Sequence, residues 1–250
     1  MAELVTPEAP TLPWPHILRQ NWQNLSFLHW AVEPASIAHL YPPDTEPDTF
    51  EGSSYVGVVP FQMADTGFAR GPAIFGTFLE TNVRLYSVDR ASRRGVVFLS
   101  LDTTRLGMVA GGRWIFGVPY RWARMSYRGQ GDRRTYASTR RWRGAATSYV
   151  EVQVGGSQPS GPLEHYLTAR WGVHIVRAGR TWYLPNEHPF WELRRAELID
   201  FSGDGLLASV GLGDLGKRPP DHVTFSDGVA ARFGLPVRST TPRAVRPPAR

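Results

Sequence analysis

The stretch FLETNVRLY, residues 78–86, decides the fold because its side chains alternate in character from one residue to the next. Successive side chains of a β-strand point to opposite faces, so alternate residues share a face. One face, which continues to Ser87, is mostly aliphatic and is typical of a strand that packs on a core. The other face carries an acid, an amide and a guanidinium between two aromatic rings: Phe78, Glu80, Asn82, Arg84 and Tyr86.

Two interpretations of Glu80, Asn82 and Arg84, which we call the polar row, are open. In the first, the row faces solvent, and an exposed pair such as Glu80 with Arg84 contributes about 0–1 kcal/mol to stability. In the second, the row lines the interior of a closed or half-closed sheet. The charges then need each other or a ligand, because an unpaired buried charge costs several kcal/mol. Charged residues are rarely buried, so the pattern alone favours the first interpretation.

The next strand along the chain repeats this pattern more weakly. In the segment GVVFLSLD, alternation places Ser100 and Asp102 on the same face as Val96 and Phe98. Asp102 also stands just before a predicted helix, and Asp is a preferred N-cap residue. We therefore expect Asp102 to cap that helix. A short polar turn joins the two strands, which predicts a hairpin.

Elsewhere, clusters of Gly, Pro and Asp recur every eight to fifteen residues between short apolar or aromatic runs. This spacing is typical of a mainly β, antiparallel fold with few helices. Helices are predicted at 34–40, 103–116 and 162–171, two of which begin at a proline. Further strands are predicted at 25–32, 55–63, 77–88, 95–102, 125–153 (two or three strands with a turn at 129–132), 181–184, 192–201 and 206–212.

The length and composition favour one cytoplasmic domain without disulfides. All-β domains reach roughly 250 residues, and the chain has 250. Cysteine is absent, which excludes a disulfide, a thiol nucleophile and a cysteine-ligated metal site. No apolar run approaches the roughly 18 residues of a membrane span, and no secretory signal is readable. We expect a flexible segment at 1–15, a single domain at 16–235 and a disordered, basic tail at 236–250.

Positive charge is concentrated in two places. The net charge is +6, and the last fifteen residues carry four arginines and no acid, so +2 remains without them. Residues 105–143 hold ten arginines and one acid, with seven aromatic residues interleaved. This composition fits a nucleic-acid surface, with guanidiniums on phosphates and rings stacked on bases. It also fits amphipathic strands with arginine outside and aromatic rings inside, which we favour because no RNA-binding signature accompanies the charge.

Several familiar motifs are absent or incomplete. GLGDLG at 211–216 matches the pattern GxGxxG, but Pro219 and Pro220 follow where a dinucleotide-binding loop needs a helix. The seven histidines show no HxH or HExxH spacing, so a metal site is not expected. No cofactor is expected either. His29 lies in an apolar strand and is predicted to be a hydrogen-bonded core residue. His188, in the turn EHPFW, is a candidate for contact with a ligand.

Seven segments, taken in their order and spacing, resemble a known family. They are LSFLHW (25–30), DTFEGSSYVGVVPF (48–61), FLETNVRLY (78–86), VVFLSLD (96–102), GVPYRWARM (117–125), PLEHYLTARW (162–171) and EHPFW (187–191). Together they resemble the YqjF-like family of uncharacterised bacterial proteins, a branch of the acetoacetate decarboxylase-like superfamily, over about residues 20–230. The resemblance implies an antiparallel β-barrel or β-cone with a few peripheral helices, an interior ligand cavity that contains the polar row, and a possible homo-oligomer.

The resemblance also implies which group is missing. In the decarboxylase, a lysine in the context Gly-x-Pro-Lys-Lys forms a Schiff base with a β-keto acid, and a strand glutamate is similar to Glu80. The matching stretch here, at 117–121, has Tyr120 and Arg121 where the lysines would be. An arginine does not release its proton in a protein, and a tyrosine forms no imine. The only lysine, Lys217, lies far from this stretch and is predicted to be a surface residue, so imine-based decarboxylation is not expected.

The remaining groups suit acid–base chemistry. Glu80 is predicted to transfer a proton if burial raises its pKa, and Tyr120 is predicted to donate a hydrogen bond to a carbonyl oxygen. These two are the candidate catalytic residues. Arg84 is predicted to hold a carboxylate in a bidentate fork. The other candidate substrate-binding residues are Asn82, Tyr86, Arg113, Arg121 and His188.

Two functions for this site stay open. The protein is either a cofactor-free enzyme of the lyase, hydratase or isomerase type, which acts on a small carbonyl or carboxylate compound, or a non-catalytic protein that binds such a small-molecule ligand. A nucleic-acid surface at 105–143 is the third and less favoured hypothesis. None of the three involves a membrane.

Overall fold

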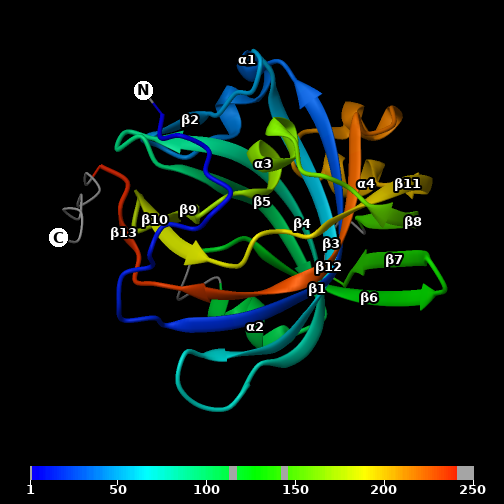
Figure 1. The fold of residues 1–250 in the computed structure, drawn as a ribbon, viewed down its shortest axis with the longest axis horizontal. Coiled ribbons are helices and arrows are strands. Elements are labelled where there is room, and N and C mark those ends of the chain that lie inside the picture. The colour runs from blue at the N-terminus through cyan, green and yellow to red at the C-terminus, as the bar shows by residue number, and fades with distance from the viewer. Residues whose placement is uncertain (1, 113–116, 142–145, 241–250) are drawn as a thin grey trace.

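The computed structural model describes residues 2–112, 117–141 and 146–240, and its strands form one continuous sheet (Figure 1). The predicted mainly β fold is confirmed. The order across the sheet is β13-β10-β9-β5-β6-β7-β8-β11-β12-β1-β3-β4-β2. The strands are β1 (Leu18–Val32), β2 (Thr45–Pro47), β3 (Ser54–Phe68), β4 (Gly76–Asp89), β5 (Arg94–Thr103), β6 (Tyr120–Gln130), β7 (Arg133–Arg140), β8 (Thr147–Ser157), β9 (Gly172–Arg177), β10 (Arg180–Glu187), β11 (Leu193–Ser202), β12 (His222–Phe233) and β13 (Val237–Arg238).

The helices are short and connect the strands. Within the described ranges, no helix is both long enough and apolar enough to cross a membrane. The α-helices are α1 (Pro34–Ile37), α2 (Leu106–Gly111), α3 (Pro162–Thr168) and α4 (Asp204–Ala208), and the 3₁₀ helices are η1 (Ala38–Leu40) and η3 (Gly213–Lys217).

Two additional pairings close the sheet on itself. β4 pairs with β5, which joins β4, β5, β6, β7, β8, β11, β12, β1 and β3 into a first ring. β10 pairs with β12, which joins β5, β9, β10, β12, β1, β3 and β4 into a second ring. The strands β12, β1, β3, β4 and β5 are common to both rings, so each of them has one face toward each ring.

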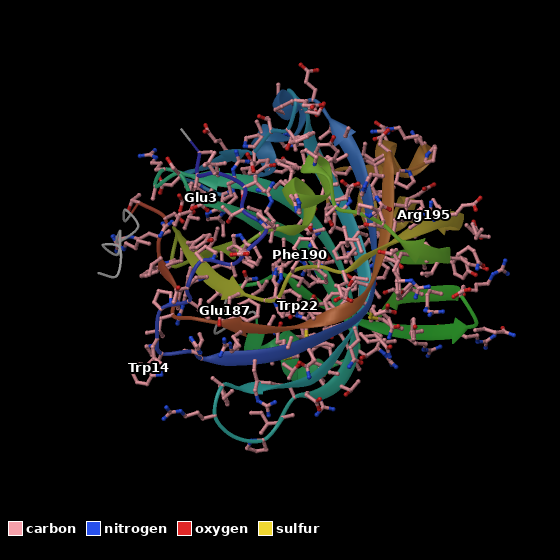
Figure 2. All side chains as sticks on the ribbon, viewed as in Figure 1. Glu3, Trp14, Trp22, Glu187, Phe190 and Arg195 are labelled. Atoms are coloured by element: carbon pink, nitrogen blue, oxygen red, sulfur yellow. The ribbon has the colours of Figure 1, made fainter. Side chains whose placement is uncertain are left out.

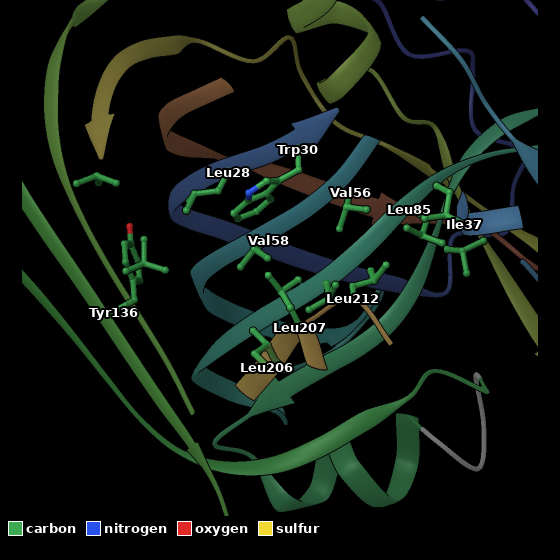
Figure 3. Packing of buried hydrophobic residues seen from close by; sticks show 14 of the residues in the cluster. Leu28, Trp30, Ile37, Val56, Val58, Leu85, Tyr136, Leu206, Leu207 and Leu212 are labelled. Atoms are coloured by element: carbon green, nitrogen blue, oxygen red, sulfur yellow. The ribbon is translucent and has the colours of Figure 1, made fainter. Parts of the chain in front are cut away.

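The two faces of the shared strands differ in the way that the alternation in β4 predicts. Val83 and Leu85 of β4 and Val58 of β3 belong to the main apolar cluster, which fills the first ring (Figure 3). Phe61 and Met63, on the other face of β3, belong to a separate apolar cluster. The polar row of β4 points to this second side. The shared strands therefore separate an apolar core from a compartment with polar groups.

Not every pairing is antiparallel. β5 pairs in parallel with both β6 and β9, which departs from the purely antiparallel fold expected. Parallel neighbours need a crossover connection rather than a tight hairpin. The connection from β5 to β6 contains α2. This crossover brings the first residue of β6, Tyr120, into register with Leu101 of β5.

Most predicted segments are present, with longer or shifted ends. Residues 125–153, expected to hold two or three strands, fall in β6, β7 and β8. The sequence patterns missed β2, β9, β12 and β13. In β12, the run Ser226-Asp227-Gly228 interrupts the apolar pattern. The other confirmed segments are the strands at 25–32, 55–63, 77–88, 95–102, 181–184 and 192–201, the hairpin of β4 and β5, and the helices at 34–40 and 162–171.

Two predictions of local structure need correction. The strand predicted at 206–212 is wrong, because this region begins within α4. Leu206 and Leu207 are both buried in the main apolar cluster, and a short apolar run does not distinguish a strand from a buried helix. The helix predicted at 103–116 is shorter, Leu106–Gly111, and residues 113–116 lie outside the described ranges.

Both ends of the described chain contact the domain. The backbone N–H of Arg94 donates to the Glu3 carboxylate at 2.9 Å, and the N–H of Leu12 donates to Glu187 at 3.2 Å. Figure 2 shows Glu3 and Trp14 on the side of the molecule where Figure 1 shows β13. β13 itself pairs with β10. Residues 241–250, the greater part of the predicted basic tail, lie outside the described ranges.

We expect Leu85→Ala to lower the free energy of unfolding by about 2–5 kcal/mol, because it empties a fully buried site in the main apolar cluster. Ile199→Ala on β11 is the matched control, since Ile199 is 44% exposed, and its cost should stay below about 1 kcal/mol. Urea unfolding followed by circular dichroism measures both. Equal losses for the two variants would contradict a packed first ring.

Candidate functional site

The polar row lines an interior cavity of about 170 Å³. Strands from the second ring form most of its wall, and α2 contributes Met108. Apart from a few polar groups, the lining is aromatic and aliphatic, as in most small-molecule sites. Trp22, labelled in Figure 2, is part of this wall. Other apolar residues of the lining include Phe27, Phe61, Met63, Phe98, Leu101 and Trp191.

Glu80 and Tyr120 meet inside this cavity. Glu80 is 2% exposed and Tyr120 is 5% exposed, and the Tyr120 hydroxyl donates to Oε2 of Glu80 at 3.1 Å. Burial raises the pKa of Glu80 to about 8, although hydrogen bonds from Tyr120 and Asn82 partly offset the effect. Burial and the neighbouring Glu80 raise the pKa of Tyr120 well above its ordinary value. At neutral pH both groups therefore carry their protons.

The position of the Tyr120 ring depends on a glycine. A Cβ atom at Gly112, just after α2, would lie 2.4 Å from the Tyr120 ring. Any side chain there would displace the ring from its place beside Glu80. Gly112, an unfavourable residue for a helix, is thus needed for packing at the site.

Arg84 lies at the other end of the row and is half-buried. Its Nε donates to the Tyr86 hydroxyl at 3.2 Å, and its Nη2 donates to the carbonyl oxygen of Leu167 at 3.3 Å. Its Cζ lies 5.4 Å from the centre of the Phe27 ring. Among the described residues, no carboxylate, including that of Glu80, forms an ion pair with Arg84. The positive charge of Arg84 is therefore stabilised by dipoles and rings without a counter-charge.

Asn82 stands between these two groups on β4. It is 4% exposed, and its Oδ1 has no hydrogen-bond partner among the described residues. An unpaired buried acceptor costs about 1–3 kcal/mol, so a donor on a ligand would recover that energy.

Tyr86 and His29 form a buried pair behind Arg84. His29 Nε2 and the Tyr86 hydroxyl are 2.7 Å apart, and Tyr86 donates to the carbonyl oxygen of Leu167 at 3.0 Å. His29 is fully buried, so the predicted hydrogen-bonded core histidine is confirmed. Burial and the charge of Arg84 hold the pKa of His29 well below its ordinary value, which keeps the ring neutral. Tyr86 thus positions the Arg84 guanidinium.

His188 also lines the cavity. Its ring lies 4.5 Å from the Trp171 ring and 5.0 Å from the Trp191 ring, and its Nδ1 lies 2.8 Å from the carbonyl oxygen of Pro189. Burial lowers the pKa of His188 to about 4, so this ring is neutral at pH 7.

The two other predicted arginines lie elsewhere. Arg121 is exposed on the outer face of β6, because Tyr120 points inward and successive side chains alternate. Arg113 lies outside the described residues. Within β6 and β7, Tyr120 and Tyr136 are buried while Arg124 and Arg128 are exposed, as expected of amphipathic strands. Arg140 departs from this pattern, because its side chain turns inward to Asp102.

The prediction for Asp102 was wrong in two respects. A β-bulge at Leu99 of β5, opposite Val83 and Arg84 of β4, shifts the pairing, so Ser100 and Asp102 turn away from the face of Phe98. Asp102 forms an ion pair with Arg140 of β7 at 2.8 Å. It does not cap α2 in the described residues, where Arg105 occupies the N-cap position.

Arg170 and Asn186 are among the polar residues of the cavity that sequence reasoning missed. Each has a buried polar atom, Nη2 of Arg170 and Oδ1 of Asn186, without a partner among the described residues. Neither residue belongs to an alternating polar pattern, although Arg170 is part of the segment PLEHYLTARW. Lys217 is a surface residue as predicted, with a 72% exposed side chain that binds Asp214 at 2.6 Å.

The fold defines the class of protein: the architecture is that of acetoacetate decarboxylase-like proteins. An acetoacetate decarboxylase-like enzyme from Sphingomonas wittichii RW1 superposes with a TM-score of 0.62 at 11% identity, covering 90% of this chain and 94% of that one. Acetoacetate decarboxylase from Legionella pneumophila gives 0.57 at 14% identity, covering 90% and 89%. The enduracididine biosynthesis enzyme MppR, complexed with pyruvate, gives 0.57 at 14% identity, covering 92% and 91%.

The family is defined by sequence. Residues 19–230 match DUF2071, described as an uncharacterized conserved protein, and the chain belongs to this family. The uncharacterized protein YqjF of Bacillus subtilis (strain 168) is 30% identical over 186 residues, which are 72% of this chain and 76% of YqjF. The resemblance found in the sequence is thus confirmed.

We expect the stability of the protein to fall, through Glu80, as the pH rises from about 4.5 to about 8. The pKa of Glu80 is about 8 in the folded chain, against an ordinary value of 4.5. Between these values the folded state holds a proton that the unfolded state has lost, so each pH unit removes up to about 1.4 kcal/mol of stability. Glu80→Gln stays neutral and should abolish this loss. The stability of this variant, measured against that of the native protein, should therefore be greater at pH 8 than at pH 5.

Urea unfolding of both proteins at pH 5 and pH 8 measures the effect. Glu46→Gln on β2 is the control, because Glu46 is exposed. The difference between Glu80→Gln and the native protein should grow by a few kcal/mol between the two pH values. A Glu80→Gln variant with the pH dependence of the native protein would show that Glu80 titrates normally.

Proposed function

We propose that this protein binds a small carboxylate-bearing carbonyl compound in the cavity, and that Glu80 moves a proton on and off that compound. The observation that carries the proposal is one apolar cavity with a protonated carboxyl group and an uncompensated guanidinium in its wall. Within the part of the chain that the structure describes, neither group forms an ion pair with a group of opposite charge. A bound anion with a polarisable carbonyl group would supply what both groups lack.

Arg84 would hold the carboxylate of the ligand. The cavity volume is similar to that of engineered apolar cavities of about 150 Å³, which bind benzene. A ligand of about six to nine heavy atoms therefore fits. Charge-assisted hydrogen bonds of a guanidinium to a carboxylate are about twice as strong as neutral ones. The apolar lining would hold the remainder of the ligand.

Tyr120 and Glu80 would have different roles in the reaction. Tyr120 keeps its proton and donates a hydrogen bond to the carbonyl oxygen, while ionised Glu80 removes a proton from the adjacent carbon. The C–H bond breaks, an O–H bond forms on Glu80, and the electron pair moves to the oxygen, which gives an enolate. Return of a solvent-exchanged proton restores the ketone. This sequence uses neither an amine nor a cofactor, and enolisation of this kind also begins dehydration and isomerisation reactions.

We expect the protein to catalyse exchange of hydrogen for deuterium beside the carbonyl group of oxo-acids, measured by proton NMR in heavy water. Because Glu80 acts as a base only when ionised, the catalysed rate should rise about tenfold per pH unit below pH 8 and level off above it. Glu80→Gln should abolish the catalysed exchange, whereas Glu46→Gln should retain it. Binding without exchange in the native protein would instead favour a non-catalytic ligand-binding protein.

We expect Arg84→Met to weaken binding of these oxo-acids about tenfold to a hundredfold, because a charge-assisted hydrogen bond contributes about 1.5–3 kcal/mol. Arg128→Met on the exposed part of β6 is the control and should leave the affinity unchanged. Isothermal titration calorimetry measures both variants. Unchanged affinity in Arg84→Met would exclude Arg84 as the carboxylate anchor.

A further inference from the structure

A second guanidinium reaches the cavity beside that of Arg84. Arg170 is 5% exposed, lines the cavity, and leaves Nη2 without a partner among the described residues. Its Nη1 binds Asp48, which also binds Arg94. Asp48 is thus shared between two arginines, and no carboxylate of the described residues forms an ion pair with Arg84. Between them, Arg84 and Arg170 have only a share of Asp48 in ion-pair contact, which favours an anion beside them.

The end of α3 places both arginines. Three successive backbone carbonyl oxygens, which have no partner within the helix because the helix ends there, accept hydrogen bonds from residues that line the cavity. Tyr166 accepts from Nε of Arg170 at 2.7 Å, and Leu167 accepts from Nη2 of Arg84 at 3.3 Å. The third carbonyl, of Thr168, accepts from the Trp191 indole at 3.1 Å.

The same two guanidiniums lie against the Tyr86 ring. Their Cζ atoms are 5.5 Å and 4.8 Å from the ring centre, for Arg84 and Arg170 respectively. Two independent contacts, with the α3 carbonyls and with this ring, thus bring them to one end of the cavity.

Glu80 lies at the opposite end. It is four residues from Arg84 on β4, which corresponds to about 13 Å between the Cα atoms of an extended strand. Arg84 Nε bonds the hydroxyl of Tyr86, which is two residues along the strand on the side remote from Glu80. Hydrogen bonds of about 2.9 Å at each end leave roughly 7 Å between the two bonded ligand atoms when the head groups keep the Cα separation. That distance corresponds to about six covalent bonds from a carboxylate oxygen to a carbonyl oxygen, or about four from carbon to carbon.

We propose that Arg84 and Arg170 together hold the carboxylate of an oxo-acid, an inference that rests on the proposed function. The carbonyl carbon of this oxo-acid lies about four bonds from its carboxylate carbon, beside Glu80 and Tyr120. An α-oxo acid, with its carbonyl next to the carboxylate, would place only one of its two groups correctly. The methylene chain between the groups would lie along the apolar middle of the cavity, beside residues such as Phe27 and Phe61. The Oδ1 atom of Asn82 remains available for a donor on a substituted chain.

Two isomers test this geometry on the native protein. 5-Oxohexanoate and 2-oxohexanoate have the same atoms and charge and differ only in the position of the carbonyl group. Catalysed deuterium exchange next to the carbonyl should be at least tenfold faster for 5-oxohexanoate, measured by proton NMR and corrected for the uncatalysed rate. Hexan-2-one, which lacks the carboxylate, should bind at least tenfold more weakly than 5-oxohexanoate in calorimetry.

Arg170→Lys tests the second anchor. Lysine keeps a charge for Asp48 but loses the fork that leaves one nitrogen for the ligand. The variant should bind 5-oxohexanoate about tenfold more weakly and bind hexan-2-one as the native protein does. Arg94→Lys is the matched control, because Arg94 binds the same Asp48 and lies outside the cavity lining formed by the described residues. If Arg170→Lys does not fold, the two isomers still decide the question on the native protein.

The failures are distinguishable. Faster exchange of 2-oxohexanoate, lost in Glu80→Gln, would overturn the remote-carbonyl geometry and leave the proposed function standing. Equal affinities of Arg170→Lys and the native protein for 5-oxohexanoate would remove Arg170 from the anchor. Absence of both binding and exchange for every compound would overturn the proposed function itself.

Discussion

The removal of the polar row from water is the constraint on which the rest of this structure depends. An acid and a guanidinium on one face of a strand respond to burial in different ways. Glu80 avoids a buried charge by keeping its proton, which is why burial raises its pKa. Arg84 has no such option, because a guanidinium stays protonated in proteins. It keeps its charge and is stabilised by a tyrosine hydroxyl, a backbone carbonyl and an aromatic ring. Burial alone thus turns an ordinary pair of charged residues into a neutral acid and an uncompensated cation.

The same chain shows what a buried charge looks like when it serves only the fold. Asp102 and Arg140, in the first ring, form a direct ion pair, and Ser100 and Ser138 provide further hydrogen bonds to it. Breaking such a pair leaves an unpaired charge, which explains why structural pairs are complete. In the second ring the pairing is incomplete: Asp48 serves both Arg94 and Arg170, and Arg84 has dipoles instead of a carboxylate. Arg84 and Arg170, the two arginines of the cavity lining, therefore have less negative charge beside them than Arg140 has. This contrast, within one molecule, is the strongest physical reason to place an anion there.

Regular alternation made the polar row predictable, and its interruption limited what else the sequence revealed. The face of β4 is regular over Glu80, Asn82 and Arg84, so the shared face followed from spacing alone. The bulge opposite Val83 and Arg84 changes the faces of β5, and nothing in GVVFLSLD marks it. The polar row faces the interior because β9 and β12 close the second ring. The sequence patterns of these two strands were missed, so the direction of the row could not be decided from the sequence. Arg170 is held at the cavity by α3 and by Asp48, and Asp48 is 122 positions away from it in the sequence. Contacts over such separations leave no local pattern.

The tyrosine at the decarboxylase lysine position sets the limit of the chemistry. An amine nucleophile has to lose its proton and attack a carbonyl carbon, and the chain's one lysine lies exposed on η3, bound to Asp214. Tyr120 is buried beside a glutamate, which raises its pKa and keeps the hydroxyl protonated. A protonated phenol donates a hydrogen bond to an oxygen but makes no bond to carbon, so only proton movement remains available to this pair. Proton movement at a carbon requires that the base and the acidic C–H bond meet. In the proposed function, the distance between Glu80 and the two arginines would therefore determine, more strictly than for a covalent intermediate, how far the reacting carbon lies from the carboxylate of the ligand.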